Sequence, residues 1–144
     1  MQLILFAIVV GFVLPVQAGI NAQLRLSLGH PITTAFASFL VGTLALGVLA
    51  LVMRVPVPAA QLAAQAPIWQ WTGGLLGAAY IAAAVVLAPR LGAATMIASV
   101  VAGQMIASVL LDHYGLVGFA QRAATPGRLL GAALVILGVR LLQR

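Results

Sequence analysis

The sequence predicts an all-α fold: a polytopic membrane bundle of about five transmembrane helices. Of its 144 residues, 64% are hydrophobic and only 6% are charged. Soluble domains carry about 25% charged residues, so this composition cannot build a water-soluble surface. The apolar residues also form continuous runs, and a helix of about 20 such residues crosses a hydrocarbon core of roughly 30 Å. Strands of a membrane barrel would instead alternate apolar and polar residues.

Proline, glycine and charged residues separate the apolar runs. We expect one integral membrane domain, residues 1–144, with helices at about residues 3–20, 32–53, 68–88, 91–111 and 129–142. Only Pro89 and Arg90 separate the third run from the fourth, which predicts a tight antiparallel hairpin. Residues 16–18 resemble the cleavage site of a signal peptide, which is the alternative interpretation of the first run. No Lys or Arg precedes that run, however, and its removal would still leave four spans.

The charged residues argue against several classes of protein. All seven basic residues are arginines, they are scattered singly, and Asp112 is the only acid. A nucleic-acid surface needs a clustered basic face, so no nucleic-acid partner is expected, and the arginines are better interpreted as helix-end anchors that contact membrane lipid. With no cysteine and two scattered histidines, no metal site and no cofactor are expected. The chain also lacks paired carboxylates, a catalytic triad and a phosphate loop, so we expect no catalytic residues and no enzyme activity.

The sequence does not specify one orientation in the membrane. With five spans, three arginines fall on the side of the amino terminus and four on the other. The positive-inside rule then gives almost no bias, which leaves both single and dual insertion open. The two halves of the chain do not repeat one another, although many transporters need two inverted repeats. A transporter built from this chain would take its second repeat from another chain, for example from an upside-down copy of itself.

Four uncharged polar residues are candidates for a substrate-binding site near the midplane. Pro15 should kink the first helix, and Gln17 and Asn21 follow it on one helical face. Tyr80 falls about mid-span in the third helix and Gln104 in the fourth. We predict that these side chains bind the polar groups of a substrate. The alternative is that they hydrogen-bond to neighbouring helices.

Asp112 and His113 form the only acid and imidazole pair of the chain. Gln104, Ser108 and Asp112 recur at a spacing of four, which predicts a polar stripe that avoids lipid. A carboxylate beside an imidazole could couple transport to protons. Both residues lie at a predicted helix end, however, where polar groups cost least, so an interfacial cap or a loop-ordering contact is the favoured interpretation.

Small residues also recur along the predicted helices and allow close approach between them. They pack helices within one subunit or, on the fourth helix, form the seam of a dimer. The candidate packing residues are Ser38, Gly42, Gly73, Gly77, Ser99 and Gly103.

Several short segments appear in a characteristic order. They are residues 11–25 (GFVLPVQAGINAQLR), 29–31 (GHP), 38–39 (SF) with Gly42, 71–80 (WTGGLLGAAY), 88–93 (APRLGA), 103–104 (GQ) and 112–118 (DHYGLVG). In order and spacing the chain resembles the YdcZ-type inner-membrane exporters of the drug/metabolite transporter (DMT) superfamily. The resemblance implies a multi-pass protein of the bacterial inner, or cytoplasmic, membrane, shaped like half of a ten-helix DMT transporter.

The resemblance also shows where this chain departs from related transporters. Small multidrug members of the superfamily work as antiparallel dimers with a carboxylate in the first helix. Here the first helix offers Gln17 and Asn21 and no acid. Uncharged lining residues favour a neutral, zwitterionic or partly apolar substrate, because an unpaired ion would be costly to desolvate.

We therefore expect a small secondary transporter or exporter of small molecules. It would act as an oligomer, either an antiparallel homodimer or a pair with a paralogous partner, and its substrate is not specified by the sequence. The alternative is a non-transporting membrane subunit that stabilises a larger membrane complex.

Overall fold

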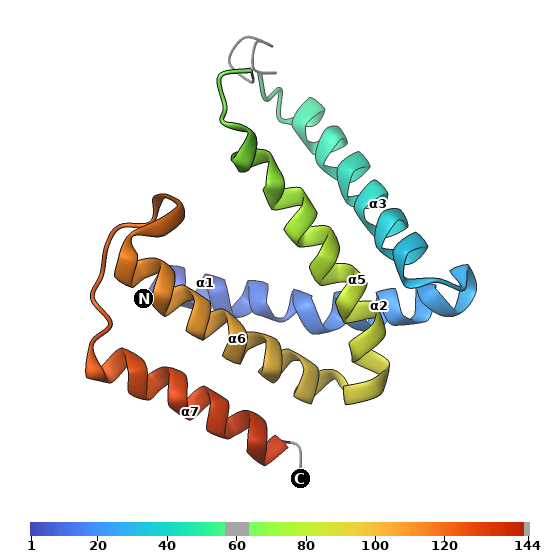
Figure 1. Cartoon of the computed structure of the whole chain (residues 1–144). Coiled ribbons are helices and arrows are strands. Elements are labelled where there is room, and N and C mark those ends of the chain that lie inside the picture. Colours follow the sequence, from blue (N-terminus) through green and yellow to red (C-terminus); the bar gives the residue numbers. More distant parts are fainter. Residues whose placement is uncertain (57–63, 143–144) are drawn as a thin grey trace. The chain divides into compact units, whose positions relative to one another are not determined.

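The computed structural model describes residues 1–56 and 64–142, and all regular structure in these ranges is helical (Figure 1). The all-α prediction is confirmed. Residues 57–63 and 143–144 lie outside the described part of the chain. The chain divides into two compact units, Val16–Pro89 and Met1–Pro15 with Arg90–Arg144. The elements in order are α1 (Gln2–Gly11), α2 (Val13–Leu28), α3 (Pro31–Val52), η1 (Ile68–Thr72), α5 (Gly73–Leu91), α6 (Ala93–Tyr114), η2 (Leu116–Gly118) and α7 (Pro126–Leu142).

Four helical segments of the described chain are long and apolar enough to cross a membrane. They are Gln2–Leu28, Pro31–Val52, Ile68–Leu91 and Ala93–Tyr114. A helical membrane bundle is therefore what the structure supports. The fifth expected span corresponds to α7, which has 17 residues. At about 1.5 Å per residue it would extend over roughly 26 Å, at the lower limit for a crossing.

The first membrane-length segment is interrupted between α1 and α2. The interruption lies at Phe12, whose backbone keeps right-handed helical angles (φ −65°, ψ −22°). Pro15 explains it, because a proline has no N–H to donate to the carbonyl four residues earlier, here that of Gly11, and its ring crowds that carbonyl. The sequence placed the end of this helix near residue 20, but α2 continues to Leu28.

The connection from α2 to α3 is fixed by backbone and side-chain capping. Gly29 adopts φ +77°, and its N–H donates to the carbonyl of Arg25 at 2.8 Å, a common way to end a helix. His30 then caps α3, since its Nδ1 accepts a hydrogen bond from the N–H of Ile32 at 3.2 Å. Pro31 occupies the first helical position, where its missing N–H costs nothing.

Within the unit Val16–Pro89, α3 and α5 pack against each other (Figure 1). Ala35 of α3 forms a buried cluster with Ile81 and Val85 of α5, and Tyr80 and Ala82 cover its edge. Such contacts stabilise a membrane protein through close fit, because lipid chains are as apolar as these side chains.

The end of α5 differs from the expected boundary. The helix continues through Pro89 and Arg90 to Leu91, and the interruption lies at Gly92, which adopts φ +74°. Membrane helices tolerate an internal proline because neighbouring groups satisfy the freed carbonyl. The predicted break at residues 89–90 is therefore displaced to the glycine, whose φ is unfavourable for other residues.

In the other unit, α6 and α7 pack side by side (Figure 1). Thr95 at the start of α6 donates a 3.5 Å hydrogen bond to the carbonyl of Leu142 at the end of α7. At the opposite ends, Asp112 of α6 forms an ion pair with Arg128 of α7. The two helices are therefore antiparallel.

We predict that Val85→Ala destabilises the α3–α5 pair, because Val85 is fully buried (0% exposed) and the loss of two methyl groups leaves a gap. The midpoint of thermal unfolding in detergent measures the effect, which should correspond to about 1 kcal/mol. Val48→Ala is the matched control, because Val48 on α3 is 61% exposed. Equal midpoints for the two variants would contradict the assigned core.

Candidate functional site

The two predicted amides of the first membrane-length segment lie one helical turn apart on α2. Gln17 is half-buried, and Asn21 is only 4% exposed. The Asn21 side chain forms no hydrogen bond to another described residue. The described residues contain no fully buried side-chain nitrogen or oxygen that lacks a partner. The Asn21 amide therefore keeps some accessible surface.

Tyr80, the third predicted residue, lies on α5 in the same unit as the two amides. It is half-buried and packs against the cluster of Ala35, Ile81 and Val85. Its side chain thus packs against the cluster that α3 and α5 share. A direct role of its hydroxyl in binding a substrate stays a prediction.

Gln104, the fourth predicted residue, lies on α6 in the other unit. Its side chain is exposed, as is that of Ser108 one turn later, while Asp112 at the end of the stripe is half-buried. The structure therefore places three of the four predicted residues in one unit and Gln104 in the other. A single cavity lined by all four stays a prediction.

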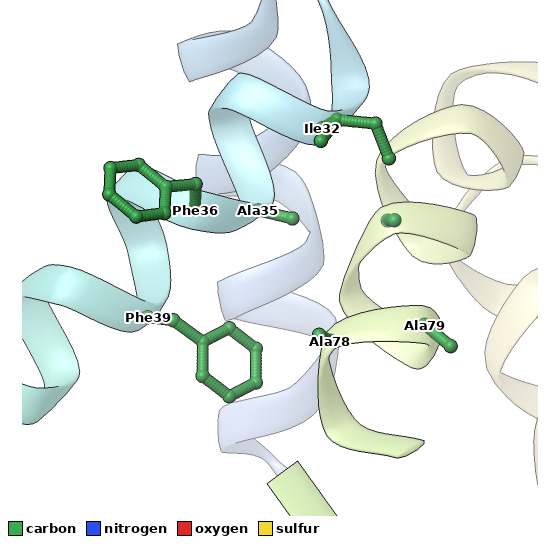
Figure 2. Close-up of a pocket in the computed structure, with 7 residues that line it drawn as sticks. Ile32, Ala35, Phe36, Phe39, Ala78 and Ala79 are labelled. Carbon is green, nitrogen blue, oxygen red and sulfur yellow. The ribbon is translucent and has the colours of Figure 1, made fainter. Parts of the chain in front are cut away.

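An apolar pocket of about 410 Å³ lies between α3 and α5. Figure 2 shows the ring of Phe39 pointing from α3 toward α5, close to Ala78. The Phe39 ring also lies 3.1 Å from where a Cβ on Gly77 would stand, so this glycine gives the ring its room. The lining residues are Ile32, Ala35, Phe36, Phe39, Ala78, Ala79 and Ala82. Such a pocket suits an apolar group and offers no side-chain charge.

None of the four predicted residues lines this pocket, and the sequence analysis missed it. The signal was present, because Ile32, Phe36 and Phe39 recur at helical spacing and so share a face. The facing alanines Ala78 and Ala82 are also one turn apart. In runs that are apolar on every side, however, no single face is distinguished by its hydrophobicity.

Asp112 and Arg128 connect the end of α6 to the start of α7. The Asp112 carboxylate accepts a charge-assisted hydrogen bond from the Arg128 guanidinium. The backbone carbonyl of Asp112 accepts a 2.7 Å bond from the N–H of Arg122. Arg128 also donates to the carbonyls of Arg122 and Ala123, at 3.1 and 3.4 Å. A single arginine thus holds both the carboxylate and the connecting loop.

His113 binds the same loop from the adjacent position. Its Nδ1 accepts a 3.2 Å hydrogen bond from the N–H of Ala124, and its carbonyl accepts a 3.1 Å bond from Nε2 of Gln121. The loop also contains Val117 at φ +55°, an unfavourable angle for a β-branched residue that the surrounding bonds must maintain. Asp112 and His113 therefore both make loop-ordering contacts, and proton coupling through them stays a hypothesis.

The six small residues proposed to pack helices differ in their surroundings. Gly77 contacts Phe39, and Ser99 donates a 2.8 Å hydrogen bond to the carbonyl of Thr95. Ser38 is half-buried. A Cβ added at Gly42, Gly73 or Gly103 would meet no described atom within 4 Å.

A family model described as "Putative inner membrane exporter, YdcZ" matches residues 2–141. No curated protein and no solved structure matches the chain.

We predict that Arg128→Gln loosens the α6–α7 loop, because it removes the ion pair to Asp112 and the bonds to two carbonyls. Trypsin cleavage after Arg122, followed by mass spectrometry, should become about fivefold faster if the contacts contribute ~1 kcal/mol. Arg140→Gln on the exposed end of α7 is the matched control and should leave this rate unchanged. Unchanged cleavage in Arg128→Gln would show that the loop is held by other contacts.

Proposed function

Because this chain belongs to the YdcZ family of inner membrane exporters, we propose that it is a small secondary transporter that exports small molecules across the cytoplasmic membrane. The family is described as one of exporters and not of enzymes, which supports transport, and the membrane-length helices agree with a multi-pass protein. Membership in the wider DMT superfamily, the oligomeric state and the binding residues are parts of this proposal.

The observation that carries the proposal is the position of the amides on α2. Gln17 precedes the end of its membrane-length segment, Leu28, by eleven residues. At about 1.5 Å per residue this is roughly 16 Å, close to the middle of a 30 Å core. Polar groups at that depth are costly unless they meet protein, water or a ligand. Asn21, one helical turn after Gln17, is only 4% exposed, and the two amides on one face of α2 are what supports the proposal of a polar cavity there.

The substrate class follows from the chemistry of these side chains. Gln17, Asn21, Tyr80 and Gln104 carry no charge and offer donors and acceptors. The pocket beside Phe39 adds apolar surface within the same unit as three of them. Together they favour a neutral, zwitterionic or partly apolar molecule over a cation that needs a carboxylate counter-charge.

We propose further that two chains of opposite orientation form the transporter. One chain supplies a single set of helices without an internal repeat, and an inverted second copy would complete the symmetry that alternating access uses. The exposed face of α6 is a suitable seam between the two chains, because Gly103 and Ala107 permit close approach of a second helix. In such a dimer the polar side chains of Gln104 and Ser108 would contact protein and not lipid. In the alternative form of this proposal, a paralogous chain inserted in the opposite orientation takes the place of the second copy.

The rival function, a non-transporting subunit of a larger complex, has one observation in its favour. A Cβ added at Gly42, Gly73 or Gly103 would meet no described atom within 4 Å, so these glycines leave helix faces open to a partner chain, whether a subunit of another kind or a second copy. A subunit of that kind needs no water-filled cavity, and this difference separates the two functions.

We predict that a cysteine at residue 17 is labelled by a membrane-impermeant maleimide, because a transport cavity admits water to that depth. The chain has no cysteine of its own, so single-cysteine variants need no background mutations. Gln17→Cys, Asn21→Cys and Gln104→Cys should react. Leu44→Cys, exposed on the apolar face of α3, should not react.

Failure of all three cysteines to react would favour a dry, non-transporting subunit. The proposed binding roles would also be contradicted if Gln17→Ala and Gln104→Ala exported an identified substrate at the rate of the unaltered protein.

A further inference from the structure

A second pocket, distinct from the apolar one, lies at the carboxyl-terminal end of α2. Its volume is about 450 Å³. It belongs entirely to the unit Val16–Pro89. The lining residues are Ala22, Gln23, Arg25, Leu26 and Gly29, with Pro89 of α5. The pocket combines a guanidinium and an amide with an apolar wall, and the proposed transport function does not use it.

Arg25 is a cation without an acidic partner among the described residues. The only acidic side chain is Asp112, and it is committed to the ion pair with Arg128. Among the described residues the Arg25 guanidinium forms no hydrogen bond or ion pair, although the residue is half-buried. A cation partly removed from water favours an anion nearby, and the described residues supply none to Arg25 beyond the carbonyl groups at the end of its own helix.

The depth of the pocket indicates which anion is available. Arg25 lies three residues before Leu28, where the first membrane-length segment ends. That is the level of the lipid headgroups, where arginines are commonly found in membrane helices. A guanidinium can bind phosphate through two parallel hydrogen bonds, which a lysine cannot reproduce. Leu26, Ala22 and Pro89 would then contact the glycerol backbone and the first methylene groups.

We propose that this pocket binds the phosphate of an anionic phospholipid, with Arg25 as the principal contact. An anionic lipid is preferred to a zwitterionic one because it brings net negative charge to an uncompensated arginine, whereas a choline or ethanolamine group adds a second cation. The Gln23 amide is placed to bond the headgroup. The site neutralises Arg25 and attaches the end of α2 to the headgroup layer.

The test is a lipid titration of the purified full chain in detergent, followed by native mass spectrometry and the midpoint of thermal unfolding. Phosphatidylglycerol should bind and raise the midpoint, and phosphatidylcholine should not. Arg25→Gln should bind phosphatidylglycerol about tenfold more weakly, since it loses a charge-assisted pair. The affinity of Arg25→Lys for phosphatidylglycerol should fall between those of the unaltered protein and Arg25→Gln. Arg140→Gln, an exposed arginine of α7, should bind like the unaltered protein.

A second variant keeps the charge and fills the space. Ala22→Leu should weaken phosphatidylglycerol binding without removing any cation, so the result does not depend on the stability of Arg25→Gln. Equal affinities for the unaltered protein, Arg25→Gln and Ala22→Leu would overturn the proposal, and so would equal losses in Arg25→Gln and Arg140→Gln. An Arg25-dependent stabilisation by inorganic phosphate alone would assign the site to a soluble phosphate compound and overturn the lipid assignment.

Discussion

Hydrocarbon offers backbone N–H and C=O groups no partner, so each of these groups must be satisfied within the protein. This constraint accounts for the helices, and it also accounts for where they stop. The helix is interrupted just before Pro15, which cannot donate a hydrogen bond. Helix α2 ends before Gly29, whose N–H donates to the Arg25 carbonyl. Helix α3 then begins with a cap from His30, whose side chain accepts the N–H of Ile32. At the end of α6, the Asp112 carbonyl receives the N–H of Arg122.

The same constraint places charged side chains and uncharged polar side chains at different depths in the membrane. The ion pair of Asp112 and Arg128 lies where α6 ends and α7 begins, and Arg25 lies in the last turn of α2. Gln17 and Asn21 lie deeper in their membrane-length segment. Uncharged amides can be placed there at a cost that a charged group would exceed several-fold. The proposed transport of neutral or zwitterionic molecules would use the groups that this depth permits.

The sequence was sufficient for the class of fold and the family, because both depend on features spread along the whole chain. Continuous apolar runs leave helices as the only choice, and the ordered short segments identified the family that the family model confirms. The residues at which the helices begin and end were harder to predict. Asn21 was expected to begin a connection, but it is buried in the middle of α2 because the helix runs on to the Gly29 cap. Pro89 was expected to break a helix that continues past it to Leu91.

The binding surfaces were harder still to predict, for a physical reason. Polar residues such as Gln17 and Gln104 stand out in an apolar run, so they were selected. The apolar pocket of Phe36, Phe39 and Ala78 did not stand out, because all sides of those helices have similar hydrophobicity. The Arg25 pocket needed the structure, since Arg25 and Pro89 are far apart in the sequence.

The central claim is that two oppositely inserted copies form one transporter, and the orientation of the chain tests it most directly. Ala120 is exposed in the connection between α6 and α7, so Ala120→Cys can be labelled in intact cells with an impermeant thiol reagent. The account predicts labelling of about half of the molecules, with the rest labelled only after the membrane is opened. Labelling of all molecules, or of none, from outside would contradict the antiparallel homodimer, and the second repeat would have to come from a paralogous chain.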